Sequence, residues 1–225
     1  MDKIKSLTGM LDLYDDGDKT NLPAKLFYLE KKIRDIFKGY KLNEIRTPIL
    51  EDTNLFIRSV GGASDIVNKE IYSFNDRNDK GIALRPEGTA SVVRAIIEKK
   101  LDQSNHKLWY MGPMWRYERP QKGRYRQFNQ AGVEILGIPE GMPEFEMISI
   151  VCSIISEFKL QNCTIKINHL GAQKNKELFC NALVKYLEPF KESLDEKDRQ
   201  RLEKNPLRVL DSKNNETQDI LRDAP

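Results

Sequence analysis

Two stretches of apolar, aromatic and β-branched residues lie close together in this sequence and are joined by a short polar loop. They run from Lys107 to Trp115 and from Gln127 to Leu136, with eleven residues between them. Because residues of these types favour β-strands and the connection is short, we expect a long antiparallel hairpin whose loop projects into solvent. A hairpin of this length commits the chain to a fold built on an antiparallel sheet.

The loop of this hairpin holds more positive charge than the rest of the chain together. The whole chain has a net charge of +3, which is too small to identify a nucleic-acid binder. From Arg116 to Arg126 there are five basic residues and one acidic residue, a net of +4, so the rest of the chain sums to −1. Arginine side chains match phosphate oxygens, which favours a polyanion site, whereas a solvated turn is the commoner explanation for an isolated basic hairpin.

Apolar periodicity predicts further helices and strands around the hairpin. The segment from Asn21 to Tyr40 has apolar residues at helical spacing, with Asn21 as the expected N-cap. Leu42 to Leu50 predicts an edge or interface strand that Pro48 interrupts. The other expected elements are a hairpin formed by Glu70–Phe74 and Gly81–Leu84, a helix after Gly88, a helix over Glu144–Phe158 and a strand over Thr164–Asn168.

The charged, helical pattern that begins near Ala172 contains no predicted strand. We therefore expect an α+β domain over residues 1–171, an antiparallel sheet flanked by helices, and a helical appendage over residues 172–225. No apolar run approaches the roughly 20 residues of a membrane span. The charged N-terminus lacks the hydrophobic stretch of a secretory signal, so we expect no membrane association and a cytoplasmic location.

Four segments resemble one family in the same order. RYERPQKGRYRQFNQAGVEILG, which begins at Arg116, resembles motif 2 of class II aminoacyl-tRNA synthetases in its histidyl form. LNEIRTPILE resembles motif 1, LRPEGTASVVRA resembles the amino-acid-binding segment, and NPLRVLDSKN resembles part of the helical insertion of bacterial histidyl enzymes. The resemblance implies an incomplete class II catalytic fold with the start of that insertion. It also implies a homodimer formed through the motif 1 region near Pro48.

The resemblance implies a histidine–tRNA ligase, which activates histidine with ATP to histidyl-adenylate and transfers it to the 3′ end of tRNA(His). Mg²⁺ would enter mainly on the ATP phosphates, so no metal site of the protein itself is expected. Arg116 would be the catalytic arginine that bridges the histidine carboxylate and the α-phosphate. The other implied ATP-binding residues are Glu118 near the adenine amino group, Arg124 near the terminal phosphates, and Tyr125 and Phe128 against the base.

The amino acid and the tRNA would be bound by further residues of the same segments. Glu87 and Thr89 are implied to hold the α-amino group of histidine. The resemblance assigns Gln130 to substrate binding and Glu134 to the imidazole ring, while Arg119, Gln121 and Lys122 would meet the acceptor end of the tRNA. Taken alone, Glu87 also fits a carboxylate at a helix N-terminus. Gln130 and Glu134 fit polar positions on the solvent face of a strand, and the three loop residues fit free exposure to solvent.

A complete enzyme of this kind continues with a histidine-specific motif, motif 3 and an anticodon-binding domain. We therefore interpret the chain as the N-terminal part and expect it to be nearly inactive alone. One alternative is a non-enzymatic paralogue such as the regulatory subunit of ATP phosphoribosyltransferase, in which motif 2 is degraded; here it is intact. A dimerising nucleotide-binding fragment without turnover is another. One departure from the family is Thr8, which stands where an arginine usually precedes the Gly9–Met10 pair.

Overall fold

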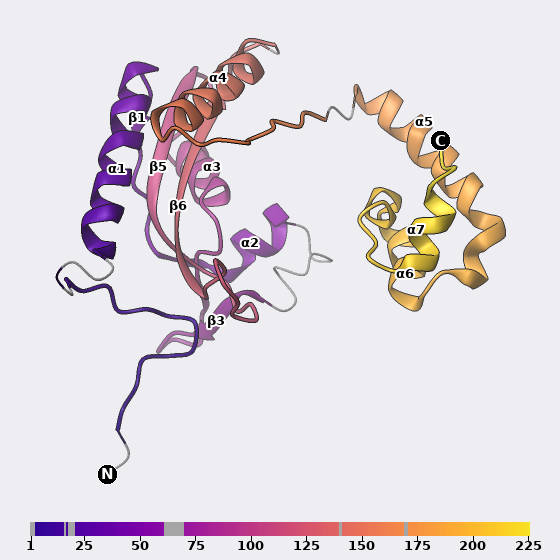
Figure 1. Ribbon diagram of the computed structural model, residues 1–225, viewed down its shortest axis with the longest axis horizontal. Coiled ribbons are helices and arrows are strands. Elements are labelled where there is room, and N and C mark those ends of the chain that lie inside the picture. The colour runs from indigo at the N-terminus through magenta and orange to yellow at the C-terminus, as the bar shows by residue number, and fades with distance from the viewer. Residues whose placement is uncertain (1–2, 16, 18–20, 61–69, 140, 169–170) are drawn as a thin grey trace. The chain divides into compact units, whose positions relative to one another are not determined.

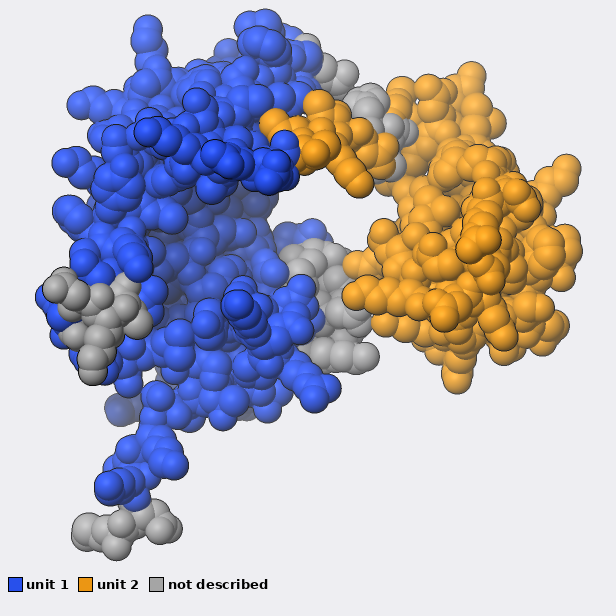
Figure 2. Space-filling view, in the orientation of Figure 1, with its two compact units in different colours: residues 1–163 blue, residues 164–225 orange. Residues whose placement is uncertain are grey.

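The chain divides into two compact units, residues 1–163 and residues 164–225, which are coloured separately in Figure 2. The structure is a computed structural model, and it describes residues 3–15, 17, 21–60, 70–139, 141–168 and 171–225. The division falls after Cys163, before the boundary that we placed near Gly171. Within the described residues, no helix is both long enough and apolar enough to cross a membrane.

The predicted long hairpin is the main element of the first unit. Strands β5 (His106–Trp115) and β6 (Gln127–Leu136) pair antiparallel over their whole length, from His106 opposite Leu136 to Trp115 opposite Gln127. The short strand β1 (Asn43–Glu44) extends this sheet by pairing parallel to β5. The α+β fold and the hairpin are thus confirmed, with one parallel pairing that we did not predict.

The segment from Leu42 to Leu50 does not form the single strand that we predicted. β1 belongs to the hairpin sheet, whereas β2 (Leu50–Asp52) belongs to a second sheet. In that sheet, β4 (Gly81–Leu84) lies between β2 and β3 (Tyr72–Asn75) and pairs antiparallel with both. Pro48 lies between the two short strands, where it has no N–H to continue a ladder. The second sheet contains the smaller predicted hairpin, β3 (Tyr72–Asn75) and β4 (Gly81–Leu84).

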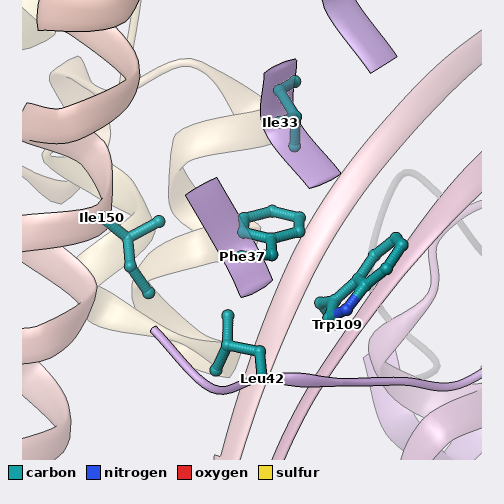
Figure 3. Close-up of a cluster of buried hydrophobic side chains, with 5 residues drawn as sticks. All are labelled: Ile33, Phe37, Leu42, Trp109 and Ile150. Atoms are coloured by element: carbon teal, nitrogen blue, oxygen red, sulfur yellow. The ribbon is translucent and has the colours of Figure 1, made fainter. Parts of the chain in front are cut away.

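Helices α1 (Leu22–Gly39) and α4 (Met142–Glu157) cover one face of the long hairpin (Figure 1). The buried side chains of this layer are Ile33, Phe37, Leu42, Trp109 and Ile150 (Figure 3). The hydroxyl groups of Tyr40 and Ser153 are hydrogen-bonded across the layer at 2.8 Å. Asn21 is the N-cap residue of α1, as predicted, but it has the left-handed conformation and its side chain makes no capping hydrogen bond.

Helix α3 (Thr89–Glu98) packs on the opposite face of the long hairpin. Val92 and Ile96 of α3 contact Leu108, Tyr110 and Met114 of β5. Helix α2 (Thr53–Val60) and the second sheet also contact α3, with a small core made of Phe56, Ala83 and Ala90. The first turn of α3 is therefore brought next to the face of β6 that carries the predicted site residues.

The described part of the second unit forms helices and no strand. Its α-helices are α5 (Gln173–Leu187), α6 (Glu196–Lys204) and α7 (Asn215–Leu221), and its 3-10 helices are Glu188–Ser193 and Pro206–Val209. The core consists of Leu183, Leu187, Leu194, Leu202 and Val209. At residues 164–168, the predicted strand is absent. Ile165 and Ile167 are exposed there, and a strand forms only where a neighbour pairs with its backbone.

A buried carboxylate connects three segments of the second unit. Asp198 of α6 accepts hydrogen bonds from the hydroxyl groups of Ser212 and Thr217, the latter at 3.0 Å. Arg201 donates to the same carboxylate at 2.9 Å. Because Asp198 is only 1% exposed, these donors offset the cost of burying its charge. The segment that resembles the family's insertion is thus folded around Asp198.

Candidate active site

The predicted site residues of β6 lie in one row on the face of the sheet that α3 contacts. Phe128 lies opposite Met114, and Gln130 lies opposite Gly112. Alternate residues of a strand share a face and are about 6.6–7 Å apart, so Phe128, Gln130 and Glu134 point to the same side. Gly132, between Gln130 and Glu134, leaves a gap in this row. The hairpin thereby places the residues implied for ATP at one end and those implied for histidine at the other.

Arg116 follows β5 directly and is held at the cationic end of the row. Its backbone amide donates to the Arg126 carbonyl at 2.9 Å, and its Nε donates to the Pro86 carbonyl at 2.9 Å. Its guanidinium lies 5.1 Å from the centre of the Phe128 ring. The ion pair with Glu118 is long, at 3.9 Å, so a strand-end salt bridge, the alternative role for Arg116, is weak.

Glu118 and Arg124 form an ion pair within the loop. Arg124 Nε lies 3.1 Å from Glu118 Oε2, without the alignment of a hydrogen bond. The Glu118 side chain is mostly buried, whereas that of Arg124 is 61% exposed. Tyr125 is partly exposed beside them. The structure therefore brings the two charged residues implied for ATP together, but as partners of each other.

The tip of the loop is a tight turn that projects its polar side chains outward. Gln121 and Arg124 exchange two backbone hydrogen bonds of 3.1 Å and 2.9 Å. Arg119, Gln121 and Lys122, which we predicted to meet the tRNA acceptor end, are all exposed here. Their geometry permits contact with a large ligand but also fits free solvent exposure, and the assignment stays a prediction.

Two carboxylates meet at the other end of the row. The Glu87 carboxylate accepts the backbone amides of Thr89 at 2.6 Å and Ala90 at 2.9 Å, so it caps the N-terminus of α3. The Thr89 hydroxyl donates to Glu134 at 2.6 Å. The capping role that we weighed for Glu87 is therefore present. A carboxylate oxygen can accept more than one hydrogen bond, so this role does not exclude ligand binding.

The surroundings of Glu134 disfavour its charged form. Partial burial raises the pKa of Glu134 above its ordinary value, the charge of Glu87 raises it further, and the hydrogen bond from Thr89 opposes both. Burial also raises the pKa of neighbouring Tyr110. The Tyr110 ring fills the space between Gly88 and Gly132, where an added Cβ would lie 2.2 Å from ring atoms. The acidic end is therefore closely packed around the Tyr110 ring, and among the described residues no cation is paired with Glu134.

Gln130 lies between the two ends and has an unsatisfied polar atom. Its side-chain oxygen is buried and has no hydrogen-bond partner among the described residues. Burying such an atom without a partner costs about 1–3 kcal/mol. A bound ligand with an N–H group would remove this cost, so the oxygen is a suitable acceptor for a substrate donor.

An open cavity of about 780 Å³ lies between α2 and α3 beside the acidic end. Glu87 and Thr89 line it, together with apolar side chains that include Leu55, Val93 and Ile97. Nearby, Arg94 of α3 is paired with the buried Glu51 at 2.8 Å. Among the described residues, no group of three or more His, Cys, Asp or Glu side chains is arranged to hold a metal ion.

Arg85 was missed in the sequence analysis although it holds the site segments together. It is only 7% exposed, and burial lowers the pKa of its guanidinium. Its side chain donates to the Pro113 carbonyl of β5 at 3.1 Å and to the Thr47 carbonyl at 2.9 Å. Arg126 was also missed. Its carbonyl accepts the backbone amide of Arg116, and its Nε donates to the carbonyl of Glu118. An arginine at the end of an apolar strand was the signal for Arg85, because such a residue is buried only with several acceptors.

The fold is shared with solved structures. Over 97% of this chain and 54% of the other, it matches the apo histidyl-tRNA synthetase of S. aureus with a TM-score of 0.74 and 33% identity. It also matches a Bacillus halodurans structure described as an ATP phosphoribosyltransferase regulatory subunit/histidyl-tRNA synthetase, with a TM-score of 0.64. That match covers 94% and 57% of the two chains at 19% identity, which shows the fold alone. The fold and the hairpin place the chain among the aminoacyl-tRNA synthetases.

The sequence comparisons are more specific. A family model described as Histidyl-tRNA synthetase matches residues 24–220. A histidine–tRNA ligase of Synechococcus sp. (strain RCC307) is 46% identical over 229 residues, which cover 100% of this chain and 53% of that protein. The chain belongs to the histidyl-tRNA synthetase family, as the four segments predicted. It spans about half the length of the curated relatives it matches.

Proposed function

We propose that the chain forms part of a histidine–tRNA ligase, which uses ATP to join histidine to the 3′ end of tRNA(His). One observation carries the proposal: the Arg116 guanidinium is bonded to the carbonyl of Pro86, the residue before Glu87, and the unpaired Gln130 oxygen lies on the same face of the hairpin. The carboxylates of Glu87 and Glu134 are linked through Thr89, so a cationic group and two acidic groups border this face. A free amino acid has the complementary charges. The match to the structure described as a regulatory subunit/synthetase has 19% identity and shows the fold alone, so it does not support the regulatory-subunit alternative, whereas the ligase relative is 46% identical.

In the first step of the proposed reaction, a carboxylate oxygen of histidine attacks the α-phosphorus of ATP. A new O–P bond forms, the bond to the β-phosphate oxygen breaks, and pyrophosphate leaves. Arg116 would lie between the two anions and reduce their repulsion. Its Nε is already bonded to the Pro86 carbonyl, and its ion pair with Glu118 is long, so its terminal nitrogens retain capacity for substrate oxygens.

ATP would bind along the loop. The adenine ring would pack on Phe128 and Tyr125, with its amino group donating to Glu118. Arg124 would then have to leave Glu118 to reach the terminal phosphates, and its largely exposed side chain has the freedom to do so. Mg²⁺ would arrive with the triphosphate, because it prefers phosphate oxygens and several waters to an all-protein site.

Histidine would bind at the acidic end. Glu87 and Thr89 would accept hydrogen bonds from its α-amino group, while Gln130 and Glu134 would face the ring. An N–H of the imidazole can donate to a carboxylate, and this bond fixes the ring's tautomer. A positive charge nearby would lower the pKa of Glu134, which burial has raised, so substrate and site would stabilise each other.

The transfer step and the assembly are proposed on the same basis. Arg119, Gln121 and Lys122 are exposed at the loop tip, where they can contact the acceptor end of a tRNA. The homodimer would form through the segment around Pro48. In support, Ile49 and Leu50 are 44% and 45% exposed beside Pro48, more than apolar residues in a covered surface would be.

Histidine-dependent exchange of pyrophosphate into ATP tests the proposal. It is measured on a protein that contains this chain and extends to the length of its relatives. Absence of histidine-dependent exchange in this longer protein would contradict the ligase and favour the non-enzymatic paralogue. We expect Arg116→Ala to reduce exchange by about 10²–10³-fold, as loss of one charge-stabilising donor does. Arg222→Ala, which changes an exposed arginine after α7, is the matched control and should have no effect.

The 225-residue chain by itself provides a second measurement. We expect it to catalyse almost no exchange, because it carries only some of the groups that the reaction needs. Robust exchange by this chain alone would show that residues 1–225 hold a complete site. Retained exchange in Arg116→Ala would remove Arg116 from its proposed role without affecting the family assignment.

A further inference from the structure

A turn near the N-terminus lies against the base of the basic loop. The turn spans Leu7–Met10 and is closed by a hydrogen bond of 3.0 Å from the Met10 amide to the Leu7 carbonyl. The Gly9 carbonyl accepts two backbone amides, from Arg126 at 2.8 Å and from Gln127 at 3.3 Å. This turn thus binds the hairpin where the loop rejoins β6.

Gly9 fits this position because it has no side chain. Its φ is +78°, in the region that favours glycine. An added Cβ would lie 2.9 Å from Cγ of Arg126 and 3.1 Å from Cγ of Pro120. Pro120 is on the outgoing arm of the loop and Arg126 is on the returning arm. The turn therefore contacts both arms together.

Arg126 connects this turn to the residues proposed for ATP. Its carbonyl accepts the Arg116 amide at 2.9 Å, and its Nε donates to the Glu118 carbonyl at 3.1 Å. Its guanidinium lies 3.8 Å from the centre of the Tyr117 ring. Arg126 is thus bonded to Gly9 on one side and to Arg116 and Glu118 on the other.

We propose that the turn Leu7–Met10 is a clamp that sets the positions of Arg116 and Glu118 through Arg126. Gly9 and Arg126 are then positioning residues for ATP, and neither needs to touch substrate. The clamp acts through the backbone of Gly9, so it does not require the arginine that Thr8 replaces. The inference rests on the proposed function for its effect on catalysis, but the clamp itself can be tested without activity.

Hydrogen–deuterium exchange of the 225-residue chain tests the clamp. In Gly9→Ala, we expect the amides of Arg116, Arg126 and Gln127 to exchange at least about tenfold faster, because opening the clamp exposes them. Amides in the middle of β5 and β6 should be unchanged. The matched control is Gly17→Ala, since Gly17 also has a positive φ, +71°, but no atom lies within 4 Å of its added Cβ. Equal exchange in the two variants would overturn the clamp.

A second variant covers the case in which Gly9→Ala fails to fold. Arg126→Lys keeps the charge and the backbone bonds but removes the planar group that stacks on Tyr117 and bonds to Glu118. In the longer protein, it should lower kcat for pyrophosphate exchange or raise the KM for ATP by about tenfold. The KM for histidine should change less than that for ATP. Among the residues proposed to bind histidine, Arg116 is bonded to Arg126, whereas Glu87 and Glu134 make no hydrogen bond to the clamp in the described structure.

The outcomes separate the clamp from the proposed function. Equal changes in the KM values for ATP and histidine would indicate a general structural defect and overturn the positioning role. No change in any constant would also overturn it. If the wild-type protein shows no histidine-dependent exchange while Gly9→Ala still accelerates amide exchange, the ligase proposal fails and the clamp remains.

Discussion

Asp198 in the helical unit and Glu134 on the hairpin are both removed from water, but they are bonded differently. Asp198 is 1% exposed and accepts from Ser212, Thr217 and Arg201. Glu134 is half-buried, and in the described residues its hydrogen bond comes from Thr89 alone. A carboxylate that stabilises a fold is supplied with donors by its own chain. Glu134, which we propose to bind histidine, keeps unused acceptor capacity, and its partial burial disfavours its charged form.

The two tryptophans allow this comparison to be tested unit by unit. Trp109 and Trp115 both lie on β5 in the first unit, and they are the only tryptophans of the chain. Their fluorescence therefore reports unfolding of the first unit. Helical circular dichroism includes the second unit, whose described residues are largely helical.

The largest effect is expected for Asp198→Ala. It leaves two buried hydroxyl groups and a charged donor without their acceptor, which should destabilise the second unit by about 3–5 kcal/mol. In the variant, part of the helical circular dichroism signal should be lost at a lower urea concentration than in the wild type. The unfolding transition seen by tryptophan fluorescence should be unchanged. Asp219→Ala, which removes an exposed carboxylate of α7, is the control and should have little effect. A fluorescence transition that shifts with Asp198→Ala would show that the two units unfold together.

Arg85→Met should have the next largest effect, in the first unit. The change keeps the length of the side chain but leaves the Pro113 and Thr47 carbonyls without their donor. We expect the free energy of unfolding to fall by about 3 kcal/mol. A urea titration monitored by tryptophan fluorescence measures this change. Arg77→Met at an exposed position of the β3–β4 loop is the control. A loss below about 1 kcal/mol would mean that water satisfies these carbonyls and that Arg85 is dispensable.

Gly132→Ala should have a smaller effect on the same unit. The added Cβ would lie 2.2 Å from the Tyr110 ring, so the ring and the side chains packed against it must move. Overpacking of this kind typically costs about 1–3 kcal/mol. Gly39→Ala, where no atom lies within 4 Å of the new Cβ, should be close to neutral in the same urea titration. Equal stability of both variants would contradict the close packing of Tyr110.

Glu134→Gln should give the smallest change, and the size of the change depends on pH. Because burial raises the folded-state pKa of Glu134, the penalty for its charge is absent below the unfolded-state pKa. The penalty grows as pH rises toward the raised pKa and is fully present above it. The variant should therefore be slightly more stable than the wild type at neutral pH and have a flatter pH profile. Asp102→Asn, an exposed control, should leave the profile unchanged, and a variant that is less stable at neutral pH would contradict this account.

Local pattern was enough to predict the elements that depend on neighbours in sequence. Alternation and residue type predicted β5 and β6, and helical periodicity predicted α1, α3 and α4. The same evidence failed where a distant partner decides the outcome. Whether the segment around Pro48 joins one sheet or two depends on its pairing with β4 and β5. Thr164–Asn168 has a strand-like sequence but no paired neighbour among the described residues.

The candidate site shows the same limit. The roles of Arg116, Glu87 and Glu134 came from the resemblance, and their binding roles stay predictions. Which residues meet could not be read from sequence, because Thr89 and Glu134 are 45 positions apart. The contacts of Arg85 join residues separated by 28 and 38 positions, so its place at the end of an apolar strand could suggest burial but not which carbonyl groups it bonds.

The layer of α1 and α4 against the long hairpin has a consequence for synthesis on the ribosome. β5 and β6 are separated by a short loop and can pair soon after both have emerged. Phe37 of α1, however, packs with Ile150 of α4, which is made more than 100 residues later. At about 5–20 residues per second, the apolar stripe of α1 stays uncovered for roughly ten seconds. During that interval the nascent chain exposes the apolar face of α1. We therefore expect a chaperone to bind α1.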